Sequence, residues 1–161
     1  MVTSLVTQRA WCVSVSHHPT GAGEARARLS AELAPEVGSE ALADAISVIA
    51  ELVGNAIRHA RPLAGDVIRV SWSVCRAPDD EVVRLTVTDG GGTTTPVIRT
   101  PDPDALDGRG LAIVEALSDE WGFERDGLGQ SVWAEIHCPI PPLSPLPALP
   151  LPPTHPPLPP R

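Results

Sequence analysis

Apolar and polar residues recur with two different periods along residues 9–138, and the change of period separates the predicted elements. Alternation with a period of two, rich in Val, Ile and Trp, predicts β-strands over residues 9–16, 67–75, 81–88 and 130–138. Strong helix formers predict helices over residues 22–34, over residues 40–59, and from residue 111 to about residue 121. This order of strands and helices predicts an α+β fold, with an antiparallel or mixed sheet and helices on one face.

The predicted helix over residues 40–59 has an unusual polar face. Three- and four-residue steps predict one apolar stripe, formed by Ile46, Ile49, Ala50, Val53, Ile57 and Ala60. Glu51, Asn55 and His59 recur at four-residue steps and are expected on the opposite face. A solvated helix surface is the ordinary explanation of such a spacing. Ser39 is a candidate N-cap of this helix.

Composition divides the chain into three parts. The 161 residues are enough for one domain with a real core, which we place at residues 9–138, after an N-terminal extension of residues 1–8. Residues 139–161 hold 12 of the 19 prolines, so we expect an extended or disordered tail there. This tail is either a passive solvated segment or a ligand for an aromatic-lined groove on another protein.

Charge and cysteine usage narrow the class of protein. The formal net charge of −8 argues against direct binding of nucleic acid as the main activity. Three distant cysteines, Cys12, Cys75 and Cys138, give neither a zinc pattern nor a disulfide framework. His17 and His18, without further ligands nearby, are expected in a solvated loop. No signal peptide or long apolar run is present, which predicts a cytoplasmic protein without a membrane span.

Two glycine-rich segments change the interpretation of the polar helix face. Asp89 stands at a predicted strand end and is followed by three glycines. Residues 93–107 then form a long polar loop typical of a lid. Gly108, Arg109 and Gly110 open the last predicted helix, and such a helix N-terminus suits a phosphate. The sequence has neither the P-loop nor the dinucleotide-binding glycine pattern.

Together these segments could form a nucleotide site. The carboxylate of Asp89 could accept a hydrogen bond from the exocyclic amine of adenine. The amide oxygen of Asn55 could bind Mg²⁺ that also contacts the phosphates. Glu51, one helical turn away, could take the proton from an attacking hydroxyl or water.

The order of motifs resembles the histidine-kinase-type ATPase domain shared by gyrase B, sensor histidine kinases and MutL. The matching segments, over residues 9–138, are ELVGNAIRHA, VTDGG, GRGLAIVEALSDEWG and GQSVWAE. Among these proteins the chain is most similar to the small, stand-alone anti-sigma-factor serine/threonine kinases of actinobacteria. The resemblance implies a two-layer α/β sandwich with a mixed, mostly antiparallel sheet and ATP held under a lid.

The resemblance also implies roles for individual residues. Glu51 matches the catalytic base, Asn55 the Mg²⁺ ligand, and Asp89 the residue that reads adenine, with Gly91 or Gly92 beside the base. The remaining matches are nucleotide contacts: Arg58 near the phosphates or the lid, Gly108, Arg109, Gly110 and Leu111 in the second glycine box, and Ser131 as a hydroxyl near Asp89. Gln130 stands where the family often has a basic residue.

These observations lead to one principal hypothesis and two alternatives. The principal one is an ATP- and Mg²⁺-dependent kinase that phosphorylates Ser or Thr on a small anti-sigma-factor antagonist. The first alternative is a non-catalytic ATP-binding module that regulates a sigma factor or another partner by occupying it. The second is an adaptor that works through the proline-rich tail. Relatives of this type are often homodimers, which makes a homodimer an expectation for this chain too.

Overall fold

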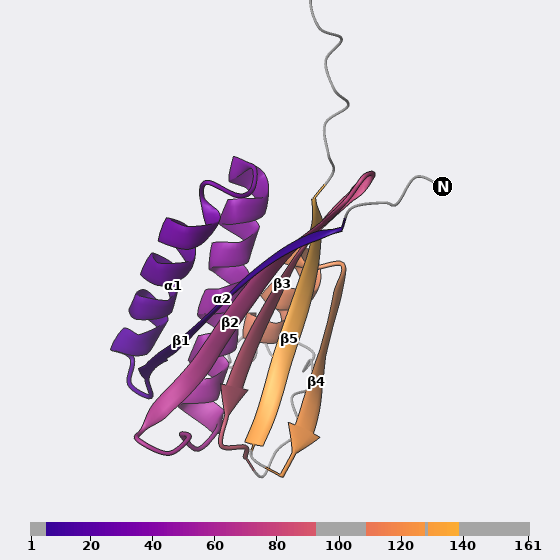
Figure 1. Ribbon diagram of the computed structural model, residues 1–161. Coiled ribbons are helices and arrows are strands. Elements are labelled where there is room, and N and C mark those ends of the chain that lie inside the picture. Colours follow the sequence, from indigo (N-terminus) through magenta and orange to yellow (C-terminus); the bar gives the residue numbers. More distant parts are fainter. Residues whose placement is uncertain (1–5, 93–108, 128, 139–161) are drawn as a thin grey trace, which may run out of the picture.

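The computed structural model describes residues 6–92, 109–127 and 129–138, which form one sheet and three helices (Figure 1). The predicted lid, the proline-rich tail and Gly108 lie outside the described residues. In chain order the elements are β1 (Thr7–Ser16), α1 (Thr20–Leu33), α2 (Ser39–His59), β2 (Val67–Ala77), β3 (Asp80–Asp89), α3 (Arg109–Leu117), β4 (Glu120–Asp126) and β5 (Gly129–Cys138). Strand β1 includes Thr7 and Gln8, so it begins two residues earlier than the predicted strand.

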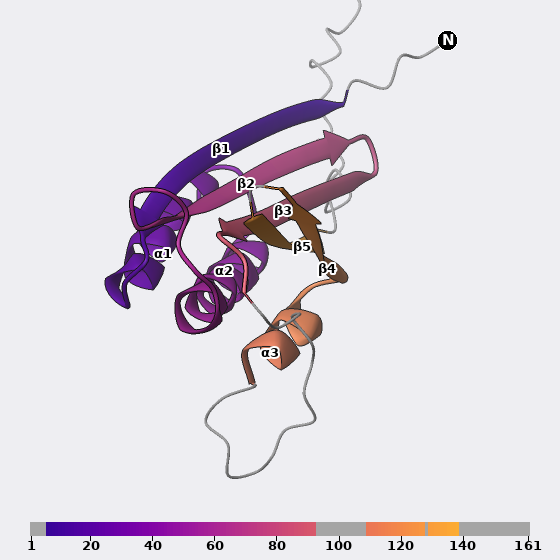
Figure 2. The same ribbon diagram turned by 90° about the horizontal axis from the view of Figure 1, so that it is seen from below.

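The sheet has the strand order β1-β2-β3-β5-β4, and all four pairings are antiparallel. Figure 2 shows the three helices on the same side of this sheet, and no helix of the described residues covers the other side. Alternate strand residues face the helices, and they form the core together with the inner sides of α1 and α2. The predicted α+β architecture, with helices on one face of a mostly antiparallel sheet, is confirmed. Among the described residues, no helix is long and apolar enough to cross a membrane.

Helix α2 lies against the middle of the sheet, and its buried side differs from the predicted stripe. Ile49 and Val53 are fully buried as predicted, whereas Ile46, Ala50, Ile57 and Ala60 are only partly buried. The remaining core positions are Ala45, Val48, Leu52 and Ala56. The stripe is rotated because α2 contacts the sheet, α1 and α3 at once. The predicted cap is also wrong, since Ser39 is the first helical residue and Gly38 takes the N-cap position without a side-chain bond.

The clearest error of the sequence prediction is the edge strand β4, whose residues the sequence pattern places at the end of the last helix and in the following loop. Helix α3 ends at Leu117, and the chain pairs with β5 from Glu120 onward. In this strand Gly122 lies directly under the ring of Trp133, where a Cβ would come within 2.8 Å of the ring. Pairing with a later strand creates β4, and a local pattern of seven residues does not reveal it.

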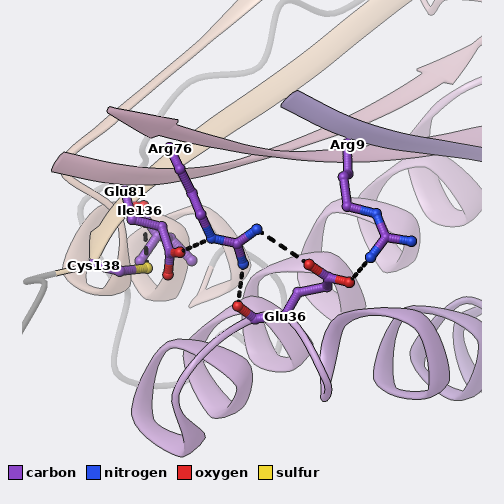
Figure 3. Close-up of polar contacts among 6 residues, drawn as sticks. All are labelled: Arg9, Glu36, Arg76, Glu81, Ile136 and Cys138. Carbon is purple, nitrogen blue, oxygen red and sulfur yellow. Dashed lines mark hydrogen bonds and ion pairs between the residues drawn. The ribbon is translucent and has the colours of Figure 1, made fainter. Parts of the chain in front are cut away.

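A charged cluster fastens the loop between α1 and α2 to the sheet (Figure 3). The carboxylate of Glu36 accepts hydrogen bonds from Arg9 of β1 and from Arg76 of β2, the latter at 3.2 Å. Arg76 also donates to the backbone carbonyl of Glu36 and to the carboxylate of Glu81. Burial alone would lower the pKa of Arg76, but its hydrogen bonds to Glu81 and Glu36 raise it overall.

We expect Arg76→Ala to lower the free energy of unfolding by about 1–3 kcal/mol, because two largely buried carboxylates would each lose a charged donor. The side chains of Glu36 and Glu81 are only 10% and 14% exposed, so water cannot fully replace the guanidinium. Urea unfolding measures the loss. Arg26→Ala, at an exposed position of α1, is the matched control and should change stability by less than about 0.5 kcal/mol. Equal effects of the two changes would contradict this role.

Candidate functional site

The polar side of α2 faces the first turn of α3. Glu51 and Asn55 are therefore half-buried and not fully solvated. Gly110, the second residue of α3, is buried against them. A Cβ at this position would come within 2.7 Å of Glu51 Oε2 and 3.3 Å of Asn55 Oδ1. The absence of a side chain at Gly110 is thus what allows the N-terminus of α3 to approach the carboxylate and the amide.

Arg58 extends this cluster toward solvent. Its Nη2 atom donates a hydrogen bond to Asn55 Oδ1 at 3.1 Å. The guanidinium also lies over Gly54, where a Cβ would come within 3.0 Å of Arg58 Nη1. Arg58 and His59 are both exposed, so the polar face of α2 changes from half-buried at Glu51 to open at its C-terminus. The amide oxygen expected to bind a cation is thus already contacted by a positively charged group.

Asp89, the last residue of β3, is the most buried charged residue that the structure describes, with an exposed fraction of 2%. Its Oδ1 atom accepts a hydrogen bond from the backbone N–H of Gly91 at 2.7 Å. Burial raises the pKa of the Asp89 carboxyl, while the bond from Gly91 and the nearby His17 and Arg125 oppose that rise. A carboxylate held in so dry a place is an efficient acceptor for a specific polar ligand atom.

The glycine run after Asp89 joins the end of β3 to the end of α2. The backbone N–H of Gly90 donates to the carbonyl of Arg61 at 2.7 Å, and the N–H of Arg61 donates to the carbonyl of Gly91 at 2.9 Å. Gly91 has a φ of +80°, which favours glycine. A Cβ on Gly92 would come within 2.7 Å of the His59 carbonyl oxygen. These glycines bring Asp89 to the same end of the domain as Asn55.

We expect Gly90→Ala to destabilise the protein by about 2–3 kcal/mol, because its Cβ would press on the carbonyl oxygen of Pro62. The nearest atoms are the carbonyl oxygens of Pro62 and Arg61, which belong to the backbone and cannot rotate away as a side chain could. The thermal midpoint measures the effect. Gly127→Ala is the matched control, since no atom lies within 4 Å of its Cβ position. A Gly90 variant as stable as the control would show that the contact between the glycine run after β3 and the segment after α2 is looser than described.

His17 corrects another expectation. We predicted a solvated loop for the histidine pair, and only His18 is exposed. His17 Nε2 is part-buried and lies 3.0 Å from the Ala60 carbonyl and 3.3 Å from the Ala56 carbonyl, at the C-terminal end of α2. The β1–α1 turn is thereby attached to the helix that carries the polar cluster. No local sequence signal indicates a contact between residues more than 35 positions apart.

Ser131 and Asp89 lie on opposite faces of the sheet. Ser131 lies opposite Thr88, and their hydroxyl oxygens are 2.8 Å apart on the sheet face away from the helices. Gln130, not Ser131, lies opposite Asp89 on the helix side. The structure therefore does not bring the Ser131 hydroxyl to Asp89. Sequence reasoning noted Gln130 only as a departure from the family pattern, although the register of β5 places it beside the carboxylate.

The second glycine box is described only in part. Gly108 lies outside the described residues, and Arg109 is described only as the first residue of α3. Gly110 contacts Glu51 and Asn55 as stated above, and the next residue, Leu111, is half-buried. The structure thus assembles Glu51, Asn55, Arg58 and Gly110 at one place.

Comparison with known proteins assigns this arrangement to a family. The sequence model described as "Histidine kinase-like ATPase domain" matches residues 15–136, which is most of the chain. The chain belongs to the histidine kinase-like ATPase family. Membership of this ATPase family implies that the chain binds ATP.

A solved structure supports the same assignment. The histidine kinase-like domain is similar to the crystal structure of the RsbU and RsbW domains of Rv1364c from Mycobacterium tuberculosis, with a TM-score of 0.57 and 25% identity. The match covers 81% of this chain and 33% of that one, so this chain spans about a third of the length of its neighbour. No curated protein matches this chain closely.

Proposed function

We propose that this chain is an ATP- and Mg²⁺-dependent protein kinase that phosphorylates Ser or Thr on a small anti-sigma-factor antagonist. The observation that carries the proposal is the joint retention of Glu51 and Asn55, one turn apart on α2, against Gly110 at the start of α3. Similarity to a structure that includes an RsbW domain supports the anti-sigma-factor type. A sigma factor is the further partner that this type of regulator implies.

The residues present fit ATP and Mg²⁺. Asp89 offers a buried acceptor for the exocyclic amine of adenine, and the first turn of α3 offers backbone N–H groups near Asn55 for the phosphates. Asn55 Oδ1 is the oxygen that would hold Mg²⁺, which itself supplies charge neutralisation at the phosphates. Arg58 now occupies that oxygen, so it would exchange Asn55 for a phosphate oxygen when the site is filled.

Glu51 is the group that would handle the proton. In the proposed transfer, the hydroxyl oxygen of the substrate forms a bond to the γ-phosphorus while the bond from that phosphorus to the β–γ bridging oxygen breaks. The hydroxyl proton goes to the Glu51 carboxylate, and ADP leaves with the bridging oxygen. Contact with Gly110 holds the carboxylate beside the first turn of α3, where the phosphates are expected.

Incubation of the protein with MgATP and candidate antagonist proteins tests the kinase proposal. We expect phosphate on a Ser or Thr of one antagonist, detected by mass spectrometry, and no transfer without Mg²⁺. The control omits the kinase. A protein that binds ATP but modifies none of its physical partners would contradict the proposal and favour the alternative below.

The contact between Glu51 and Gly110 also favours a second candidate, a non-catalytic ATP-dependent binding module. A carboxylate lying against the first turn of α3 could stabilise that helix N-terminus without accepting any proton. In this case Glu51→Gln would keep partner regulation, whereas Asn55→Ala would abolish it with nucleotide binding. Loss of regulation in Glu51→Gln, with ATP affinity retained, would exclude this candidate.

A further inference from the structure

Asp89 and Gln130 are the two buried polar side chains among the described residues, with exposed fractions of 2% and 5%. They lie directly opposite each other, at the ends of β3 and β5. Residues paired in this way have Cβ atoms about 5 Å apart on the same face of the sheet. Both face the helical layer, so the carboxylate and the carboxamide are neighbours on one face of the sheet.

The orientation of the Gln130 amide follows from its partner. Arg125 Nε donates to Gln130 Oε1 at 2.8 Å. Because a guanidinium has donors only, the atom that faces it must be the carbonyl oxygen. The –NH₂ group of Gln130 therefore points away from Arg125. Because the bond to Oε1 sets the orientation of the amide, this donor is held in place for a ligand.

We propose that Gln130 is a second base-reading residue, which donates to N1 of adenine while Asp89 accepts from the N6 amine. The proposal rests on the proposed function, since it assigns a base to the same nucleotide site. The Watson–Crick edge of adenine presents a donor at N6 next to an acceptor at N1, which matches an acceptor beside a donor. Guanine presents the opposite order, an acceptor at O6 and a donor at N1. The pair therefore selects adenine over guanine.

Arg125 is a positioning residue in this arrangement. It fixes the carboxamide by its bond to Oε1, and its positive charge also lowers the pKa of Asp89 against the effect of burial. Ser131, the next residue of β5, faces the opposite side of the sheet and bonds Thr88, so it has no part in reading the base. Because Ser131 faces the other side of the sheet, Ser131→Ala is a matched control for changes at Gln130.

A chemical double-mutant cycle tests the proposal. ADP is compared with 1-deaza-ADP, in which N1 is replaced by C–H, by calorimetric titration with Mg²⁺ present. We expect the wild type to bind ADP about tenfold more tightly than the deaza compound, the effect of one hydrogen bond. Gln130→Met, similar in length but without a donor, should bind both ligands equally. Ser131→Ala should keep the tenfold preference.

Two results would overturn the proposal while leaving the ATP site in place: a wild type that binds both compounds equally, or a Gln130→Met variant that keeps the preference. The wild-type comparison stands even if the variant fails to fold. A second variant, Gln130→Glu, should lose adenine affinity because it places an acceptor opposite N1. Failure of the wild type to bind either compound would instead refute the proposed function, and this inference with it.

Discussion

Replacing Asp89 with Asn is expected to lower the affinity for ATP and ADP by about 10- to 100-fold, the value of a hydrogen bond to a charged acceptor. The Asn carbonyl oxygen would keep the bond from the Gly91 N–H, which leaves the –NH₂ group facing the N6 amine of adenine. Two donors would then oppose each other in a buried space. Calorimetric titration measures the affinity.

The same change should not destabilise the fold. Burial raises the pKa of the Asp89 carboxyl, so its charged form is unfavourable in the folded protein. Its contribution to stability is complete below the pKa of the unfolded chain and is lost as the pH rises through the folded pKa. Asp89→Asn should therefore match the wild type at a pH below the unfolded pKa of about 3.9 and exceed its thermal midpoint at pH 7.

Asp79→Asn, in the exposed β2–β3 turn, is the matched control for both measurements and should change neither. An Asp89→Asn variant that binds ATP as the wild type does would refute the role of Asp89 in reading the base. An Asp89→Asn variant that becomes less stable than the wild type as the pH rises toward 7 would show instead that the carboxylate is a structural anion, held by His17 and Arg125.

Glu51→Gln should reduce phosphate transfer by about 10²- to 10⁴-fold, the usual contribution of a general base, and change ATP affinity by less than about threefold. Gln has the same shape as Glu, so it can keep its place against Gly110 without accepting a proton. The rate of phosphate transfer and the affinity for ATP must be measured on the same preparation.

Glu40→Gln, an exposed change in the first turn of the same helix, is the control and should affect neither quantity. Transfer at the wild-type rate in Glu51→Gln would remove the carboxylate from the mechanism. Loss of ATP affinity together with transfer would indicate that Glu51 acts by stabilising α3, which is the basis of the non-catalytic alternative.

Local sequence patterns predicted most of the fold because its long elements have strong periodicity. Helix α2 and strands β2, β3 and β5 lie within two residues of their predicted bounds. Strand β4 escaped prediction because its partner follows it in the sequence and its apolar residues, Trp121 and Phe123, also suit the end of a helix. The stripe on α2 was rotated because three neighbours, not one, cover that helix.

The candidate site was predictable where one element carries the residues and less so where strands must be aligned. The four-residue spacing of Glu51 and Asn55 predicted that they share one face of α2. The glycine pattern around Gly110 predicted the helix N-terminus that lies against them. Sequence reasoning placed Ser131 beside Asp89, whereas the structure places Gln130 there. This is an error of one residue in the alignment of β5, and a shift of one residue moves a side chain to the other face of the sheet. The contact of His17 with α2 depends on the fold alone.

Titration of the wild-type protein with ATP, with and without Mg²⁺, tests the central claim most directly. The account predicts one ATP bound per chain, more tightly when Mg²⁺ is present, and loss of that difference in Asn55→Ala because the amide oxygen is the metal ligand. Absence of binding up to millimolar ATP with Mg²⁺ present, by a protein that is folded by circular dichroism, would contradict it.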